Sequence, residues 1–148
     1  MIKYHIIFKI FCISLIVISC AGKVPHAIGV FANCPEKPNC VSTKNSNKKN
    51  YIEPIKYLSS LDEAKKVLML TLNSFGSSKI KDKQENFIYV EFVSDIFGFV
   101  DDTEFYFTKP GIIDFRSASR IGYSDLGVNR ERMETIRNKF NNLVNAKN

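Results

Sequence analysis

Acidic, arginine and small hydroxyl side chains crowd into one stretch of this sequence, between Gly98 and Arg132. In an extended strand, residues two apart share a face. Asp102 and Glu104 would therefore share a face, and so would Arg116 and Arg120 on the next strand. Carboxylates and guanidinium groups that meet across strands form ion pairs, so we predict an ion-pair lattice or a ligand-binding surface here. Its candidate members are Asp101, Asp102, Glu104, Arg116, Ser117, Ser119, Arg120, Tyr123, Asp125, Asn129 and Arg130.

The same side chains could serve other chemistry. An arginine pair, several hydroxyls and a helix N-terminus would suit an anionic small molecule or a lipid headgroup. Clustered carboxylates could hold a hard cation, but the neighbouring arginines would compete with it. We therefore expect no metal ion and no other cofactor. The protein partner, if there is one, is not indicated by any motif.

A small envelope hydrolase is the alternative from a different functional class. Ser117, Ser119 and Ser124 could be nucleophiles, but the chain has only two histidines, His5 and His26, to act as a base. This region contains neither a G-x-S-x-G nor an S-x-x-K motif. A carboxylate pair could hydrolyse glycosides, yet nearby arginines would keep both acids ionised. We therefore expect no catalytic residue and a non-catalytic accessory or binding role.

The first nineteen residues predict a signal peptide. Lys3 and Lys9 precede an apolar or small run over residues 10–19. Ten helical residues span about 15 Å, half of a bilayer core, which is too short to cross it. The run ends in Val17-Ile18-Ser19-Cys20, which resembles the lipoprotein box of bacterial lipoproteins. This likeness implies cleavage before Cys20 and a lipid on its thiol, although an ordinary signal peptide or N-terminal anchor is the alternative.

A lipid on Cys20 would make the membrane this protein's first partner, in the cell envelope and facing the periplasm or the exterior. Ala21 stands where an Asp would resemble an inner-membrane retention signal, which favours the outer membrane if the host has two. Loss of the signal peptide lowers the net charge from +6 to +4. This excess is scattered rather than gathered in a stripe, so we expect no nucleic acid partner.

Two cysteines would remain after removal of the signal peptide and acylation of Cys20, namely Cys34 and Cys40. An even remainder in an exported protein predicts a disulfide. A redox or metal role would need C-x-x-C spacing or further ligands, and neither is present. Residues 20–50 are therefore expected to form a tether and a disulfide loop.

Residues 51–148 predict a single α+β domain, in a chain of 148 residues whose 45% hydrophobic content is typical of globular proteins. Ser60 and Glu63 form a capping box ahead of an apolar stripe, and Gly76 is expected to end that helix in a left-handed conformation. A second helix is expected over residues 130–145, with Asn129 as its N-cap.

Three stretches with alternating apolar residues predict antiparallel strands, over residues 87–93, 99–107 and 112–119. A three-residue turn ending at Gly111 would place Glu104 opposite Arg116, Phe105 opposite Phe115 and Thr108 opposite Ile112. The lysines between residues 79 and 83 suggest a solvated loop, and residues 51–57 an edge or irregular strand. We expect a small antiparallel β-sheet of three or four strands with two α-helices packed on one face.

Two motifs resemble a known family. They are Cys34-Pro-x-x-Pro-Asn-Cys40-Val-Ser and the run RSASRxGxSDxGxNRxR from Arg116 to Arg132. Both resemble the domain of unknown function 1499 family, small bacterial and organellar proteins that are often exported or lipoproteins. The likeness covers about residues 34–145. It implies no activity and no catalytic residue, because the family has none established.

Overall fold

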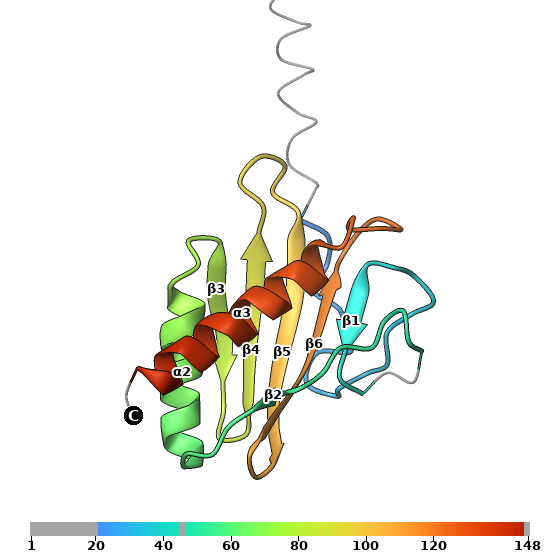
Figure 1. Ribbon diagram of the computed structural model, residues 1–148. Coiled ribbons are helices and arrows are strands. Elements are labelled where there is room, and N and C mark those ends of the chain that lie inside the picture. Colours follow the sequence, from blue (N-terminus) through green and yellow to red (C-terminus); the bar gives the residue numbers. More distant parts are fainter. Residues whose placement is uncertain (1–20, 45–46, 147–148) are drawn as a thin grey trace, which may run out of the picture.

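A computed structural model describes residues 21–44 and 47–146. Its strands form one antiparallel sheet in the order β1-β6-β5-β4-β3, and β2 also pairs with β6 (Figure 1). The expected signal peptide, residues 1–19, and the expected lipidation site, Cys20, lie outside the described residues. The strands are β1 (Cys40–Ser42), β2 (Ile55–Lys56), β3 (Ser78–Lys83), β4 (Phe87–Val93), β5 (Val100–Lys109) and β6 (Ile112–Ser119), and the helices are α2 (Leu61–Asn73) and α3 (Val128–Asn145).

The α+β class and the antiparallel sheet are confirmed, but the predicted number of strands was too small, because the sheet has six. Strand β3 occupies the lysine-rich stretch that suggested a loop, and β1 lies within the expected tether. Ile80 is the one apolar residue of β3, so the hydrophobic alternation there is weak. Lysines are common on edge strands, where they discourage pairing with other chains.

The prediction that the two helices pack on one face of the sheet was wrong. Helix α3 runs obliquely across the sheet, while α2 lies beside β3 and contacts α3 (Figure 1). The short connection of residues 74–77 joins α2 directly to β3, so α2 stays near that edge of the sheet. Helix α3 follows the longer connection of residues 120–127, which carries it back over the strands.

Helix α2 begins as predicted and ends earlier than predicted. The hydroxyl of Ser60 accepts a hydrogen bond from the backbone N–H of Glu63 at 3.3 Å. The helix stops at Asn73, and Ser74 caps it in a right-handed conformation. The hydroxyl of Ser78 then donates to the carbonyl of Leu72 at 2.8 Å. A left-handed stop at Gly76 was therefore wrong, because side-chain and backbone groups already satisfy the last carbonyls.

Helix α3 begins at Val128, and its N-cap differs from the prediction. Gly127 holds the cap position with φ +87° and offers no side chain. The carboxylate of Asp125 instead accepts the N–H groups of Gly127 and Asn129, at 3.0 and 2.8 Å. Asn129 was therefore not the N-cap; it lies one position inside the helix and is fully buried.

The pairing of β5 with β6 follows the predicted register in its middle and departs from it near the turn. Glu104 lies opposite Arg116 and Phe105 opposite Phe115, as predicted. An irregularity between Tyr106 and Lys109 then shifts the register by one residue, so Ile112 lies opposite Lys109. The predicted pairing of Ile112 with Thr108 was wrong, because β5 runs on to Lys109 and leaves a shorter turn.

The hydrophobic core lies between the sheet and the helices. Alternate residues of β4 and β5 point into it, such as Ile88, Val90 and Phe105, while Tyr89 and Glu104 between them point the other way. Fully burying a side chain of this kind contributes roughly 1.5–3 kcal/mol. The largest fully buried members are Phe92, Phe105, Phe115, Phe140, Ile55, Leu68, Leu72, Ile88, Ile113, Met133 and Ile136.

Candidate functional site

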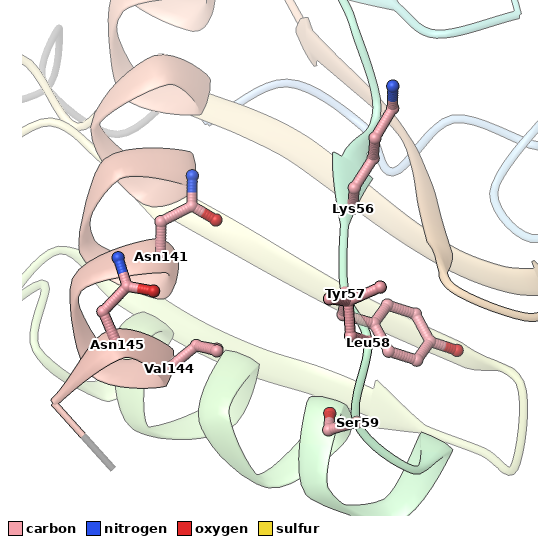
Figure 2. Close-up of a pocket in the computed structure, with 7 residues that line it drawn as sticks. All are labelled: Lys56, Tyr57, Leu58, Ser59, Asn141, Val144 and Asn145. Atoms are coloured by element: carbon pink, nitrogen blue, oxygen red, sulfur yellow. The ribbon is translucent and has the colours of Figure 1, made fainter. Parts of the chain in front are cut away.

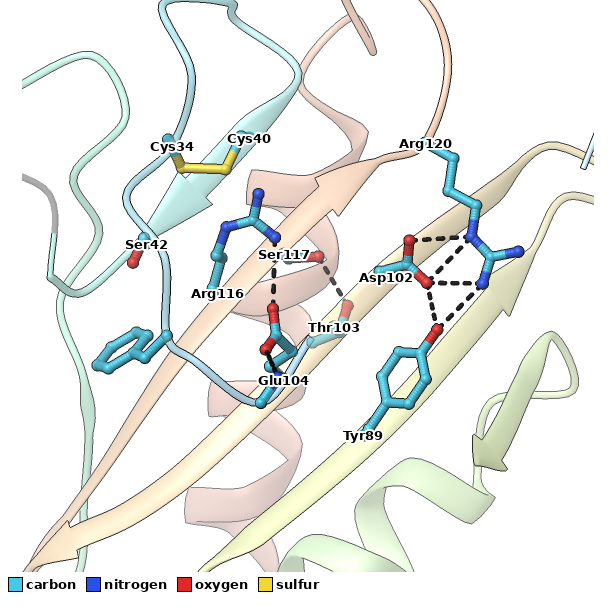
Figure 3. A network of polar contacts seen from close by, with 12 residues as sticks. Cys34, Cys40, Ser42, Tyr89, Asp102, Thr103, Glu104, Arg116, Ser117 and Arg120 are labelled. Carbon is cyan, nitrogen blue, oxygen red and sulfur yellow. Dashed lines mark hydrogen bonds and ion pairs between the residues drawn. A yellow bond between two sulfur atoms is a disulfide. The ribbon is translucent and has the colours of Figure 1, made fainter. Parts of the chain in front are cut away.

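The face of the sheet turned away from the core carries the acids and arginines singled out by the sequence. We call it the polar face, and Figure 3 shows most of its side chains. They project from β4, β5, β6 and the residue that follows β6. The polar face comprises Tyr89, Glu91, Asp102, Glu104, Tyr106, Arg116 and Arg120.

Arg120 is the centre of one half of the polar face. Its Nε lies 2.9 Å from Oδ2 of Asp102 and its Nη2 2.8 Å from Oδ1, which is a bidentate ion pair (Figure 3). Nη2 also pairs with Glu91 and donates to the hydroxyl of Tyr89. The side chains of Arg120 and Asp102 are only 5% and 2% exposed. Arg120 thus neutralises two carboxylates in a place that water hardly reaches.

Glu104 is the centre of the other half and is fully buried. Its Oε1 lies 3.3 Å from Nη1 of Arg116. Its Oε2 accepts hydrogen bonds from the hydroxyl of Tyr106 and, at 2.8 Å, from the backbone N–H of Gly29. Three donors therefore satisfy this carboxylate, and one of them comes from a residue 75 positions away in the sequence.

The segment that we expected to be a tether covers part of this face. Besides the bond from Gly29, the backbone N–H of Phe31 donates to the hydroxyl of Tyr106 at 2.9 Å. The ring of Phe31 stacks on that of Tyr106, with centroids 4.4 Å apart. The predicted disulfide is confirmed between Cys34 and Cys40, with Cα atoms 5.6 Å apart. Because Cys40 opens β1, the disulfide ties the covering segment to the sheet.

Burial and charge shift the pKa values of the polar face. Burial, reinforced by the carboxylate of Asp102, raises the pKa of Tyr89, and burial together with Glu104 raises that of Tyr106. Burial alone would raise the pKa of Glu91 too, but Arg120 and a nearby lysine lower it below its usual range. Hydrogen bonds to Asp102 raise the pKa of Arg120 despite its burial. Each shift favours the protonation state that the network needs.

Five other predicted residues form a second cluster, on the helix side of the sheet, which we call the helix-side cluster. Its members are Asp101, Ser117, Ser119, Asp125 and Asn129. The hydroxyl of Ser117 bonds to that of Thr103 at 2.7 Å and to the side chain of Asn129. The amide of Asn129 donates to Ser119 at 3.0 Å and to Asp125 at 2.8 Å. This cluster fixes the first turn of α3 to the end of β6.

Asp101 completes the helix-side cluster through a salt bridge of 2.7 Å with Arg132 of α3. Tyr123 and Arg130 belong to neither group. Tyr123 is 69% exposed. Arg130 donates to the backbone carbonyls of Lys49 and Tyr51, each at 2.9 Å. The single lattice expected from the sequence is therefore two clusters on opposite sides of the sheet, with two residues outside both.

The sequence interpretation missed several contributors to these clusters. Tyr89 and Glu91 could have been found, because they alternate with Ile88 and Val90 and must point to the face that Asp102 shares. Gly29 carries no such signal, because it contributes a backbone N–H from a distant segment.

Comparison with protein families gives one match. A family model described as a protein of unknown function, DUF1499, matches residues 31–140. The chain belongs to the DUF1499 family. No curated protein and no solved structure matches it. The resemblance expected from the two motifs is thus confirmed. The matched DUF1499 region runs from Phe31, which stacks on Tyr106 of the polar face, to Phe140 in the core.

Two cavities of this DUF1499 domain bear on function. The first, of about 400 Å³, adjoins the helix-side cluster and is lined by Ser94, Phe99, Val100, Asp101, Ser119, Ile121, Gly122, Ser124, Asp125, Val128 and Arg132. The second, of about 620 Å³, lies between the connection from β2 to α2 and the end of α3, as Figure 2 shows. It is lined by Lys56, Tyr57, Leu58, Ser59, Asn141, Val144 and Asn145, among which there is no acid.

Residues 21–44 and 47–146 contain neither a candidate metal site nor a candidate membrane span. In those ranges no three His, Cys, Asp or Glu side chains are grouped so as to hold a metal ion. The helices found there are too short or too polar to span a bilayer.

Proposed function

We propose that this DUF1499 protein is a lipid-anchored, non-catalytic accessory or binding module of the cell envelope. The observation that carries the proposal is the pairing of the buried carboxylates of the polar face, although the buried Nε of Arg116 has no hydrogen-bond partner. Arg116 and Arg120 each face a carboxylate, and the buried acids Asp102 and Glu104 have their donors within hydrogen-bond distance. Removing one partner of a buried pair leaves the other charge uncompensated, so acids and arginines paired in this way are poorly placed to react with a substrate.

The hydrolase alternative gains no support from Ser117. Ser117 is fully buried, and its hydroxyl is bonded to Thr103 and Asn129 rather than to a base. Nucleophilic catalysis would need a neighbouring base and access for the substrate. Anion binding at Arg120 is also disfavoured, because an incoming anion would have to displace Asp102 from a bidentate pair.

Metabolic labelling with palmitate tests the anchor. In a bacterium that processes lipoproteins, the wild-type chain and Cys12→Ser should incorporate label, whereas Cys20→Ser should not. The Cys12→Ser variant is the matched control, because it also removes one N-terminal thiol but leaves the lipoprotein box intact. Label retained by Cys20→Ser, or absent from the wild type, would contradict the proposed lipid anchor.

A further inference from the structure

We propose that one end of the domain lies in the interface of the lipid bilayer, a statement that rests on the anchor proposed above. The surface concerned, which we call the apolar end, is formed by two connections and the start of α3. One connection joins β4 to β5, and the other joins β6 to α3. Figure 1 shows both at the same end of the sheet. The apolar end comprises Ile96, Phe97, Phe99, Ile121, Leu126 and Val128.

These side chains are unusually exposed for their type. Ile96 is 84%, Phe97 64% and Leu126 95% exposed to solvent. The rings of Phe97 and Phe99 contact each other, with centroids 5.6 Å apart, so they form a joined surface rather than isolated residues. Contiguous apolar surface of this kind marks an interaction site.

The start of the described chain identifies the occupant as a membrane. The carbonyl of Ala21 lies 3.4 Å from Nη1 of Arg120. A methyl group on the neighbouring Gly22 would lie only 3.0 Å from the side chain of Ile121. Ala21 directly follows Cys20 and the apolar run of residues 10–19. A lipid on Cys20 would therefore hold this end of the domain, and no other, against the bilayer.

The chemistry of the apolar end suits a bilayer interface. Aromatic rings such as those of Phe97 and Phe99 combine with aliphatic side chains from the neighbouring connection, as in interfacial segments of peripheral proteins. The nearby acid Asp101 is neutralised by Arg132, and the carboxylate of Asp125 accepts hydrogen bonds from the start of α3, whereas Asp95, next to Ile96, is exposed. The 400 Å³ cavity opens between the same two connections.

Tryptophan quenching tests the orientation, because the chain has no tryptophan of its own. Phe97→Trp places a reporter at the apolar end. Leu58→Trp is the matched control, since Leu58 is fully exposed and belongs to the connection from β2 to α2, which enters α2 at the opposite end of the sheet (Figure 1). The lipid-modified full chain is reconstituted into vesicles of phosphatidylethanolamine and phosphatidylglycerol, with or without bromine on the acyl chains. Brominated lipid should quench Phe97→Trp and leave Leu58→Trp unchanged.

Vesicle flotation, measured on the same samples, separates the two proposals. Chains that float while neither variant is quenched would overturn the orientation and leave the anchor intact. The same conclusion follows if Phe97→Trp emits at short wavelength without quenching, because protein rather than lipid would then cover the apolar end. Equal quenching of both variants would also overturn the proposed orientation. Chains that fail to float would overturn the anchor and the orientation together.

Discussion

Arg120 shows what the polar face requires of a single residue. Its guanidinium serves Asp102, Glu91 and the hydroxyl of Tyr89 at once, with almost no contact to water. Transferring charged groups from water into the protein interior costs several kcal/mol per ion. Only close pairing with an opposite charge, supported by further hydrogen bonds, offsets this cost. Loss of any one paired side chain would therefore leave a buried charge uncompensated, which makes the network vulnerable at each of its pairs.

The buried tyrosines predict a loss of stability in alkali. The pKa values of Tyr89 and Tyr106 are raised in the folded chain, mainly by burial and then by the neighbouring acids. A tyrosine in the unfolded chain titrates near pH ~10. A group whose pKa is higher in the folded state stabilises the fold below its unfolded pKa, and this stability is lost as the pH rises through the folded pKa. The free energy of unfolding should therefore fall above about pH 10.

Denaturant titrations across that pH range measure this effect. The variants Tyr89→Phe and Tyr106→Phe should each show a smaller decrease of unfolding free energy with pH than the wild type. Tyr123→Phe is the control, because Tyr123 is 69% exposed, and its decrease should match that of the wild type. Equal slopes for all four proteins would show that the buried hydroxyls do not titrate as inferred.

At the scale of elements, local sequence patterns predicted some strands and caps correctly but could not predict contacts between distant segments. The alternation that defines β4 and β6 and the capping box at Ser60 are short-range signals, and the structure contains those elements where they were predicted. The match of Glu104 with Arg116 was predicted from the turn at Gly111 and is confirmed, although the register shifts next to the turn. The segment around Gly29 that covers the polar face could not be predicted to lie there. Its hydrogen bond to Glu104 joins residues 75 positions apart, and such a contact produces no periodic pattern in the sequence.

The carboxylate of Asp125 caps the start of α3, whereas we had predicted Asn129 as the N-cap. Asp125→Ala should lower the free energy of unfolding by about 1 kcal/mol, because two N–H groups lose their acceptor. Asp125→Asn should retain most of the stability, since Asn is as good a cap as Asp. Thermal or denaturant unfolding of the two variants measures the difference. An Asp125→Ala protein as stable as the wild type would show that the cap contributes nothing.

At the scale of the whole molecule, the sheet separates two interiors of different chemistry. One side holds the aromatic and aliphatic core, to which α2 and α3 contribute buried side chains. The other side holds the ion pairs of the polar face, partly covered by the segment that contains Ala21, Gly29 and Phe31. The same segment would connect the domain to its lipid, so the proposed anchor and the cover of the polar face belong to one stretch of chain. The sequence indicated both the acids and the lipoprotein box, but only the three-dimensional arrangement links them.

The central claim is that the acids and arginines of the polar face pair with one another rather than with a ligand. A double-mutant cycle on Asp102 and Arg120 tests this claim most directly. The free energy of unfolding is measured for Asp102→Asn, Arg120→Met and the double variant. Each single change should cost about 3–5 kcal/mol, and the double variant should lose clearly less than the sum. Glu134→Gln, which breaks a pair whose acid is 47% exposed, is the control and should cost less than about 1 kcal/mol. Single variants as stable as the wild type would contradict the claim. The polar face would then again be a candidate ligand-binding surface.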